Sequence, residues 1–363
     1  MVAWRPVTSA ALSAVSVATY AGIGLAGVGV INLIWRGVAR RRGKTVPAVS
    51  AGSTKAGRAR GDVLPRRVVF LRWATCLVTV GAVGVTVFGY LRAHDPAITP
   101  VTVTSPKLPP AFDGYRIALL TDIHIGPGLS GDFLRRIVDK TNAAKPDLVV
   151  IAGDLVDGSV SQLADDLNSL SDLRAPDGVL VVTGNHEYFT GMPEAWIAAF
   201  RSLGLTVLDN EGVTLRRGES TIDVLGIGDR IGPGTTASNL AMADRRLRDV
   251  AGPPSQYRIL AVHEPLQVRA DSTDGFVPND GVGYPATLGI NLALCGHTHG
   301  GQMWPIQALI RFEQPVLDGV HDIAGVTTVT SRGAGAWGPP VRVGAPPEIP
   351  LITLRAATQA GRV

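Results

Sequence analysis

An uncharged apolar stretch near the N-terminus constrains the fold of this chain most strongly. Residues 7–35 contain no charged side chain, and they exceed the roughly 20 residues that an α-helix needs to cross a bilayer. Residues 68–91 form a second apolar stretch that only Arg72 interrupts, close enough to one end for its side chain to reach the lipid headgroups. The sequence therefore predicts two transmembrane helices, at residues 7–35 and 68–91, after a short N-terminus of residues 1–6.

The segment between the two predicted spans, residues 36–67, is strongly basic. Arginines and lysines recur along it, and Asp62 is its only acidic residue. Short basic loops remain on the cytoplasmic side of a membrane. We therefore expect a two-span protein of the plasma membrane, with residues 36–67 in the cytoplasm and the chain after residue 91 on the extracytoplasmic side.

The formal net charge of +4 originates in this basic loop, because the remaining chain has more acidic than basic residues. A basic loop beside a bilayer attracts anionic lipid headgroups, whereas an acidic domain disfavours binding to polymeric nucleic acid. We therefore expect membrane lipids, and not nucleic acid, among the partners. The sequence does not indicate an oligomeric state.

From Tyr115 onward, strand-sized apolar runs rich in β-branched residues alternate with helix-like segments. The predicted strands are residues 116–120, 148–152, 179–182, 222–227, 258–262 and 290–294. The predicted helices are residues 132–143, 162–173 and 194–203. Such alternation predicts an α/β domain whose functional groups gather at the carboxyl ends of its strands. Residues 92–110, before this domain, are expected to form an extended linker or an edge strand.

Polar side chains that can bind metals follow five of the six predicted strands. They are Asp122 and His124, Asp154, Asn185, His263, and finally His297 and His299. Each group alone is typical of an ordinary turn. Together they provide nitrogen and oxygen donors without an obvious thiolate, a mixture that suits two hard-to-borderline divalent ions better than one structural zinc.

These motifs, in this order, resemble the calcineurin-like metallophosphoesterase superfamily. The matching stretches are Asp-x-His at 122–124, Gly-Asp-x-x-Asp at 153–157, Gly-Asn-His-Glu at 184–187, the later His263, and Gly-His-Thr-His-Gly-Gly-Gln at 296–302. The last motif resembles that of a bacterial membrane-associated branch, which includes phosphodiesterases and enzymes suggested to act on lipid phosphates. The resemblance implies a four-layer sandwich of two mixed β-sheets flanked by helices, over residues 111–356, followed by a tail at residues 357–363.

The resemblance also implies two divalent metal ions, for which Mn, Fe, Zn and Co all suit the ligands. Asp122, His124 and His299 would hold the first ion. Asn185, His263 and His297 would hold the second, and Asp154 would bridge both. A metal-bound hydroxide would then attack the phosphoester. His186 would protonate the leaving group or stabilise the transition state, although it could instead only support a neighbour.

Five further polar residues receive less weight. Asp157 and Glu187 fit a turn or a supporting hydrogen bond. Arg332 and Arg342 fit either a contact with substrate phosphate or the bracing of a loop, and we leave them outside the predicted site. Glu264 follows His263 in a His-Glu-Pro sequence where many members of the superfamily have His-Asn-Pro.

The sequence as a whole predicts a membrane-anchored dimetal phosphohydrolase that cleaves a phosphomonoester or phosphodiester, with a lipid or an envelope precursor as substrate. Two alternatives remain. One is a non-catalytic membrane-anchored binding or scaffold protein on the same fold, which an incomplete ligand set would favour. The other is an extracellular nucleotidase or nuclease, which shares the chemistry and differs in substrate.

Overall fold

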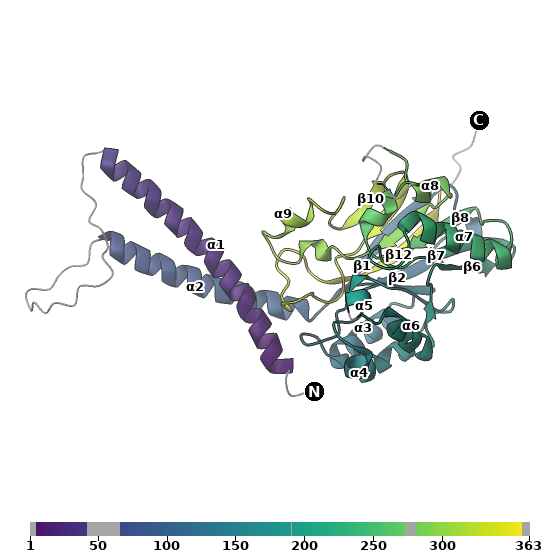
Figure 1. Cartoon of the computed structure of the whole chain (residues 1–363), viewed down its shortest axis with the longest axis horizontal. Helices are drawn as coiled ribbons and strands as arrows, with labels where there is room; N and C mark the ends of the chain where they lie inside the picture. Colours follow the sequence, from purple (N-terminus) through teal and green to yellow (C-terminus); the bar gives the residue numbers. More distant parts are fainter. Residues whose placement is uncertain (1–4, 42–65, 190, 273–274, 276–280, 358–363) are drawn as a thin grey trace, which may run out of the picture. The chain divides into compact units, whose positions relative to one another are not determined.

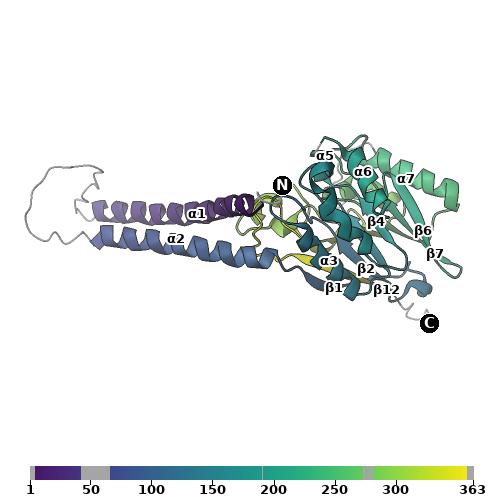
Figure 2. The ribbon, with the colours of Figure 1, turned by 90° about the horizontal axis from the view of Figure 1, so that it is seen from below.

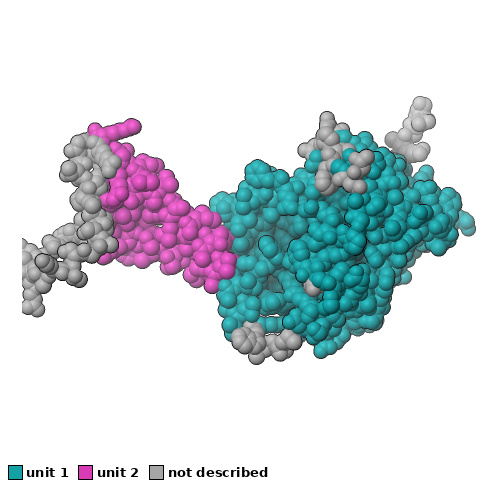
Figure 3. Space-filling model, in the orientation of Figure 1, with its two compact units in different colours: residues 1–12, 89–363 teal, residues 13–88 magenta. Residues whose placement is uncertain are grey.

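The computed structural model describes residues 5–41, 66–189, 191–272, 275 and 281–357. The chain divides into two compact units, drawn in different colours in Figure 3. One unit comprises residues 13–88. The other comprises residues 1–12 and 89–363, so it contains the first residues of α1, the last residues of α2 and all of the sheets.

Two long helices precede the sheets: α1 (Arg5–Arg41) and α2 (Arg66–Ala93). Val7–Val38 and Arg66–Ala93 have mean hydropathies of 1.8 and 1.9, and only 6% of each apolar window is buried in protein. Apolar helices of this length and exposure have the dimensions and composition of membrane spans. Both helices extend past the predicted spans, because helical backbone continues into the flanking basic residues. Most of the predicted basic loop, residues 42–65, lies outside the described residues, as do residues 358–363 of the predicted tail.

Two six-stranded sheets form the rest of the fold. The first sheet has the order β1 (Ala97–Ser105), β12 (Glu348–Ala356), β2 (Arg116–Leu120), β3 (Leu148–Ala152), β4 (Val179–Val182) and β5 (Thr206–Val207). The second has the order β10 (Gly319–Ile323), β11 (Val326–Thr330), β9 (Leu292–Cys295), β8 (Tyr257–Ala261), β7 (Ser220–Gly226) and β6 (Glu211–Arg217). Parallel pairs predominate, and β12·β2, β10·β11 and β6·β7 are antiparallel, so both sheets are mixed.

Helices cover the outer face of each sheet, so the sandwich has four layers (Figures 1 and 2). The elements beside the first sheet are α3 (Gly131–Ala143), α4 (Val160–Leu163), the 3-10 helix η3 (Ala164–Asp172) and α6 (Pro193–Ser202). The elements beside the second sheet are α7 (Thr236–Ala251), η4 (Pro265–Arg269) and α8 (Tyr284–Thr287). Shorter elements are η2 (Pro110–Phe112), α5 (Asn185–Phe189), η5 (His299–Gly301) and α9 (Gln307–Ile310).

The core follows from the alternation of side chains along each strand. In β2, Ile117 and Leu119 pack into the core between the sheets, whereas Ala118 and Leu120 pack against the helices. All four are fully buried, because a strand between two layers buries both of its faces. The predicted four-layer architecture with two mixed sheets is therefore confirmed.

The structure refines the predicted elements in two places. Residues 97–105 form β1, an edge strand that runs parallel to β12. The predicted helix over residues 162–173 is one turn of α-helix followed by η3. Residues 165–172 are rich in Asp, Asn and Ser, whose side chains compete with helical backbone hydrogen bonds, and this composition favours the departure from regular α-helix.

Candidate metal centre

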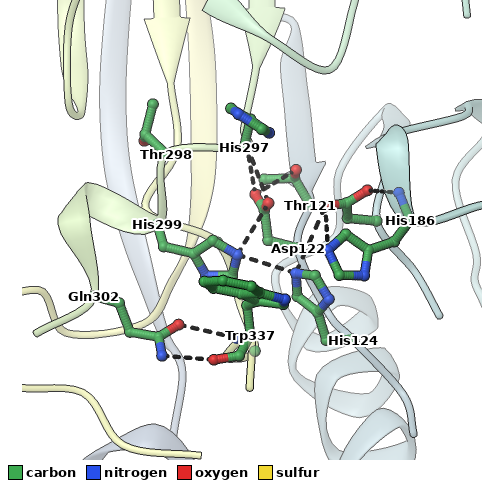
Figure 4. Close-up of polar contacts among 12 residues, drawn as sticks. Thr121, Asp122, His124, His186, His297, Thr298, His299, Gln302 and Trp337 are labelled. Atoms are coloured by element: carbon green, nitrogen blue, oxygen red, sulfur yellow. Dashed lines mark hydrogen bonds and ion pairs between the residues drawn. The ribbon is translucent and has the colours of Figure 1, made fainter. Parts of the chain in front are cut away.

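The predicted donors meet where the carboxyl ends of the inner strands converge. Strands β2, β3 and β4 are mutually parallel, and so are β8 and β9, so the loops after them leave each sheet at one edge. The backbone N–H of His297 donates to both carboxylate oxygens of Asp122, at 3.0 Å each, and thereby joins the loops of the two sheets (Figure 4). The structure thus brings all eight predicted site residues to one edge of the sandwich.

Close backbone approach requires glycine at two positions of this edge. A Cβ atom at Gly184 would collide with the Asp154 carboxylate, and one at Gly296 would collide with Thr121 and Asp122. These contacts explain the glycines of the Gly-Asn-His-Glu and Gly-His-Thr-His motifs: any side chain would separate loops whose polar groups must touch.

The backbone at the donors is strained. Five of them have left-handed φ angles: Asp122 (54°), His124 (53°), Asp154 (53°), His297 (69°) and His299 (52°). Residues other than glycine adopt this conformation at a cost, and such residues cluster at functional sites. Part of the stability gained in the buried core therefore holds these side chains in place.

The first donor cluster consists of Asp122, His124 and His299. Nε2 of His124 lies 3.0 Å from Nε2 of His299, which lies 3.4 Å from Oδ1 of Asp122. All three residues are buried. Each offers one donor atom, and the three atoms lie within 4.8 Å of one another, a geometry in which one cation could contact all three.

The second donor cluster consists of Asp154, Asn185, His263 and His297. Nε2 of His263 lies 3.1 Å from both Oδ2 of Asp154 and Oδ1 of Asn185. Nδ1 of His297 lies 3.1 Å from the same Asn185 oxygen. Oδ2 of Asp154 is also 3.7 Å from Nε2 of His124, so this carboxylate lies between the two clusters. The donors fit a pair of divalent cations, because nitrogen and oxygen atoms converge from both sides of one shared carboxylate.

Asp157 orients two histidines of the site. Its Oδ1 lies 2.8 Å from Nδ1 of His124 and 2.6 Å from Nδ1 of His186. A carboxylate only accepts, so both Nδ1 atoms donate, and both Nε2 atoms point away from Asp157. Sequence reasoning underestimated this residue. The second Asp of Gly-Asp-x-x-Asp was the available signal, but a turn residue has the same pattern.

Arg342 braces the other ring of the first cluster. Its buried guanidinium donates to the carbonyl of His299 at 2.7 Å, and Nη2 lies 3.0 Å from His299 Nδ1. The guanidinium therefore fixes the orientation of the His299 ring, whose Nε2 faces His124 at 3.0 Å. Of the two roles left open by the sequence, Arg342 has the bracing one in this structure.

Glu187 ties together the loops after β3 and β4. Its carboxylate accepts from the backbone N–H groups of Asp154, Leu155 and Gly184, at 3.1, 2.8 and 2.7 Å. Burial raises the pKa of Glu187 to about 7, with the Asp154 charge adding to the effect. Glu187 therefore supports the backbone on both sides of the shared carboxylate.

Arg332 and Glu264 lie farther from the donors. Arg332 pairs with Asp318 at 3.0 Å and with Glu348 at 2.5 Å, so it braces the end of the chain. Glu264 is buried and accepts from Arg230 at 2.8 Å and from Gln314 at 2.9 Å, and its carboxylate lies 3.9 Å from Nε2 of His297. The Glu of His-Glu-Pro thus serves a local ion pair.

The electrostatics of the centre favour bound positive charge. Burial alone would lower the pKa of His124, but the carboxylates of Asp157 and Asp154 outweigh burial and raise this pKa to about 9. Burial would raise the pKa of Asp154, yet His263 and the other histidines hold it below its usual range. Burial lowers the pKa of His297 and of His299, so these rings are neutral and offer lone pairs. A carboxylate-rich pocket with neutral imidazoles is suited to cations.

A cavity of about 470 Å³ opens beside His124, Asp157 and His186. Ser159 and the exposed rings of Phe189 and Trp337 also line it. The side chain of His186 reaches this cavity, and its Nε2 lies 4.0 Å from Oδ2 of Asp154. A ligand bound at the donors would therefore contact His186 from the side of this opening.

The chain is similar to known metallophosphoesterases. A model described as "Calcineurin-like phosphoesterase" matches residues 115–301. The chain is 33% identical, over 263 residues, to an uncharacterized metallophosphoesterase of Campylobacter jejuni, with 72% of this chain and 63% of the relative covered. It is 32% identical, over 311 residues, to a transmembrane protein with metallophosphoesterase domain of Bos taurus, with 84% and 67% covered. A Helicobacter pylori metallophosphoesterase is 34% identical over 248 residues, with 68% and 61% covered. The chain thus spans between 61% and 67% of these relatives.

Proposed function

The chain belongs to the calcineurin-like phosphoesterase family, and on this premise we propose that it is a membrane-anchored dimetal phosphohydrolase. The observation that carries the proposal is the convergence of donors from five strand ends into two clusters that share Asp154. A scaffold protein would not need this set, because seven polar side chains at one edge, five of them strained, destabilise the fold unless they bind something.

In this proposal, Asp122, His124 and His299 hold one cation, Asn185, His263 and His297 hold the other, and Asp154 bridges them. Two divalent cations bound there supply the positive charge that activates a water and binds the phosphoryl oxygens. The orientation of the rings supports the assignment. Nδ1 of His263 donates to the carbonyl of Ala152 at 2.8 Å, which leaves Nε2 as the ring atom that faces Asp154.

His186 is the proposed proton donor. The attacking water loses a proton to solvent as its oxygen adds to phosphorus, the ester P–O bond breaks, and the departing oxygen takes a proton from His186. Asp157 holds Nδ1 of His186, so Nε2 can give that proton on the open side of the site. The backbone N–H of His186 donates to Oδ1 of Asp154 at 2.9 Å, which ties this residue to the shared carboxylate. The same imidazolium would stabilise charge on the transition state.

We place the phosphohydrolase domain outside the cytoplasm, anchored by α1 and α2 in the plasma membrane. Two observations support this proposal. The loop between the helices is basic, as cytoplasmic loops are. The first residues of α1 and the last residues of α2 both belong to the compact unit that contains the sheets, as an antiparallel pair of spans requires. Labelling of an engineered cysteine at Glu219 of β6–β7 by a membrane-impermeant maleimide on intact cells tests it. If the cysteine of Glu219→Cys is labelled only after lysis, the domain lies in the cytoplasm and the proposed topology is wrong.

The activity is tested with full-length protein in phospholipid vesicles and added Mn²⁺. 4-Nitrophenyl phosphate and bis(4-nitrophenyl) phosphate report monoester and diester cleavage. We expect metal-dependent release of 4-nitrophenol from at least one of them, abolished by chelation and lowered about 10³-fold by Asp154→Asn. An undiminished rate in Asp154→Asn, or no turnover with any of Mn²⁺, Fe²⁺, Zn²⁺ and Co²⁺, would refute the proposal.

A further inference from the structure

A second cavity, of about 420 Å³, adjoins the metal centre and is chemically unlike the first. Donor residues, among them Asp154 and His297, form one end of it. The remaining wall is mostly apolar and consists of Phe189, Met303, Ile306, Ile310, Trp337 and Pro339. We name this wall the apolar groove. Its volume suits part of a small-molecule ligand, and its polar end is the place where the proposed function puts the phosphate.

Large apolar side chains at this groove are exposed to a degree that is unusual in a soluble domain. Phe189 is 68% exposed and Trp337 is 58% exposed. Trp304, Leu309 and Phe312, on the segment that carries Ile306 and Ile310, are also exposed. Exposed apolar surface of this kind marks a site that binds an apolar partner.

The groove is held by hydrogen bonds to the metal-binding loop. The amide of Gln302 donates to the carbonyl of Trp337 at 2.8 Å and accepts from its N–H at 2.9 Å (Figure 4). Gln307, at the start of α9, donates to the carbonyl of Gly300 at 3.0 Å. The wall therefore has a defined position relative to His299, as a binding surface for one part of a substrate requires.

The groove segment also connects to the end of the second apolar helix. The N–H of Trp304 donates to the carbonyl of Val343 at 2.8 Å, and the N–H of the neighbouring Arg342 donates to the carbonyl of Gly89 at 2.9 Å. A Cβ at Gly89 would collide with Val341 and Val343, so α2 reaches this loop without a gap. Gly89 lies in the last turns of α2, next to the residues proposed to leave the bilayer. The end of α2 and the groove segment therefore contact the same loop, residues 341–343.

We propose that the apolar groove binds the hydrocarbon chain of a membrane lipid phosphoester while the donor clusters bind its phosphate. This inference rests on the proposed function, and it assigns to the groove the residues that would select the lipid substrate that the sequence predicts. Glu313 also lines this cavity but does not oppose the inference, because its carboxylate pairs with Arg230 at 3.2 Å.

The test compares a methyl ester with an octyl ester of otherwise identical structure. Both are phosphomonoesters or both are phosphodiesters, according to which of the two 4-nitrophenyl substrates the protein cleaves. Full-length protein is assayed in phosphatidylcholine vesicles, and each result is the ratio of kcat/KM for the octyl ester to that for the methyl ester. Because every variant is measured in the same vesicles, partition of the octyl ester into lipid cancels between variants. We expect the double variant Ile306→Gln/Ile310→Gln to lower the ratio about tenfold, the effect of losing the burial of about two methylene groups.

The matched control is Val250→Gln, because Val250 is 83% exposed on α7 and does not line the groove. Its ratio should equal that of the parent protein. A double variant that keeps the parent ratio, with an unchanged Tm and normal cleavage of the methyl ester, would overturn the inference while leaving the proposed function intact.

A binding measurement separates the groove from catalysis. An alkyl phosphate with a photoreactive diazirine at its terminal carbon is added to the vesicles, and the crosslinked peptides are identified by mass spectrometry. We expect crosslinks in residues 303–310 and at Trp337, reduced in Ile306→Gln/Ile310→Gln and retained in Val250→Gln. Crosslinks without any turnover would support the groove and refute the hydrolase. Turnover with crosslinks only elsewhere would refute the groove.

Discussion

The two donor clusters are supported in different ways. In the first cluster, charged side chains hold the rings: Asp157 contacts His124 and Arg342 contacts His299. In the second, His263 donates to a main-chain carbonyl. Side chains can be replaced one at a time, but a main-chain carbonyl cannot. The first cluster should therefore be adjustable by substitutions that leave every metal donor in place, whereas the second should respond mainly to loss of the donors themselves.

The largest effect should come from the residue that belongs to both clusters. Asp154→Asn removes the shared negative charge between two cations, and we expect kcat/KM to fall about 10³-fold, equivalent to about 4 kcal/mol of transition-state stabilisation. Metal stoichiometry, measured on the same sample by elemental analysis, should fall below two. Asp139→Asn, a change on the exposed side of α3, is the matched control. Asp154→Asn with full stoichiometry and a rate near that of the control would show that the clusters do not share this carboxylate.

The next effect should separate the two clusters. Asp157→Ala leaves the His124 and His186 rings without their acceptor, and we expect about 10–100-fold weaker binding of one cation of two. Asp157→Asn keeps an oxygen at that position and should weaken binding less. Calorimetric titration with Mn²⁺ measures both sites. Equally weakened binding of both cations would show that the two clusters are not supported independently.

Arg342 provides a second way to disturb the first cluster. Arg342→Met removes the donor to His299 while it keeps an unbranched apolar side chain, and we expect about tenfold weaker binding of one cation. The carbonyls of Gly335 and His299 also lose a buried donor, so Tm should fall as well. Arg342→Lys keeps the positive charge but lacks the planar guanidinium, so its cation affinity should lie between those of the parent protein and Arg342→Met. Restored binding in the Lys variant would assign the effect to charge, whereas a loss equal to that of Met would assign it to geometry.

The smallest effect is expected beside the second cluster. Glu264→Gln changes a carboxylate that is 3.9 Å from His297, beyond hydrogen-bond distance. We expect less than about threefold change in Mn²⁺ affinity. The lost ion pair with Arg230, whose side chain is 38% exposed, should lower stability by no more than about 1 kcal/mol because solvent screens it. A change in metal affinity as large as that of Asp157→Ala would show that the second cluster also depends on a charged neighbour.

The inner strands were predictable because buried strands consist almost entirely of apolar residues. Strands β2, β3 and β4 have the predicted bounds, since parallel strands between two layers have nearly continuous apolar sequences. The edge strands were harder. β1 pairs with β12 from the far end of the chain, and a partly exposed strand with prolines and threonines resembles a linker until its partner is known.

Recognition of the family from five ordered motifs is confirmed by the family match over residues 115–301. The supports of the site were not predictable in the same way. Arg342 follows His299 by more than forty residues, and nothing in its local sequence distinguishes an arginine that braces a histidine from one that meets phosphate. Asp157 and Glu187 were recognised as candidates, but their bonding partners depend on how the loops pack.

The sequence by itself determined two apolar helices, an α/β sandwich and a set of donors after successive strands, because periodicity, apolar length and short motifs are local properties of the chain. Only the tertiary structure decided which side chains orient the donors and that an apolar groove adjoins them. Those features depend on contacts between residues far apart in the chain, such as His297 with Asp122 and Gln302 with Trp337. The positions of such partners are set by the packing of the two sheets, which no local pattern specifies.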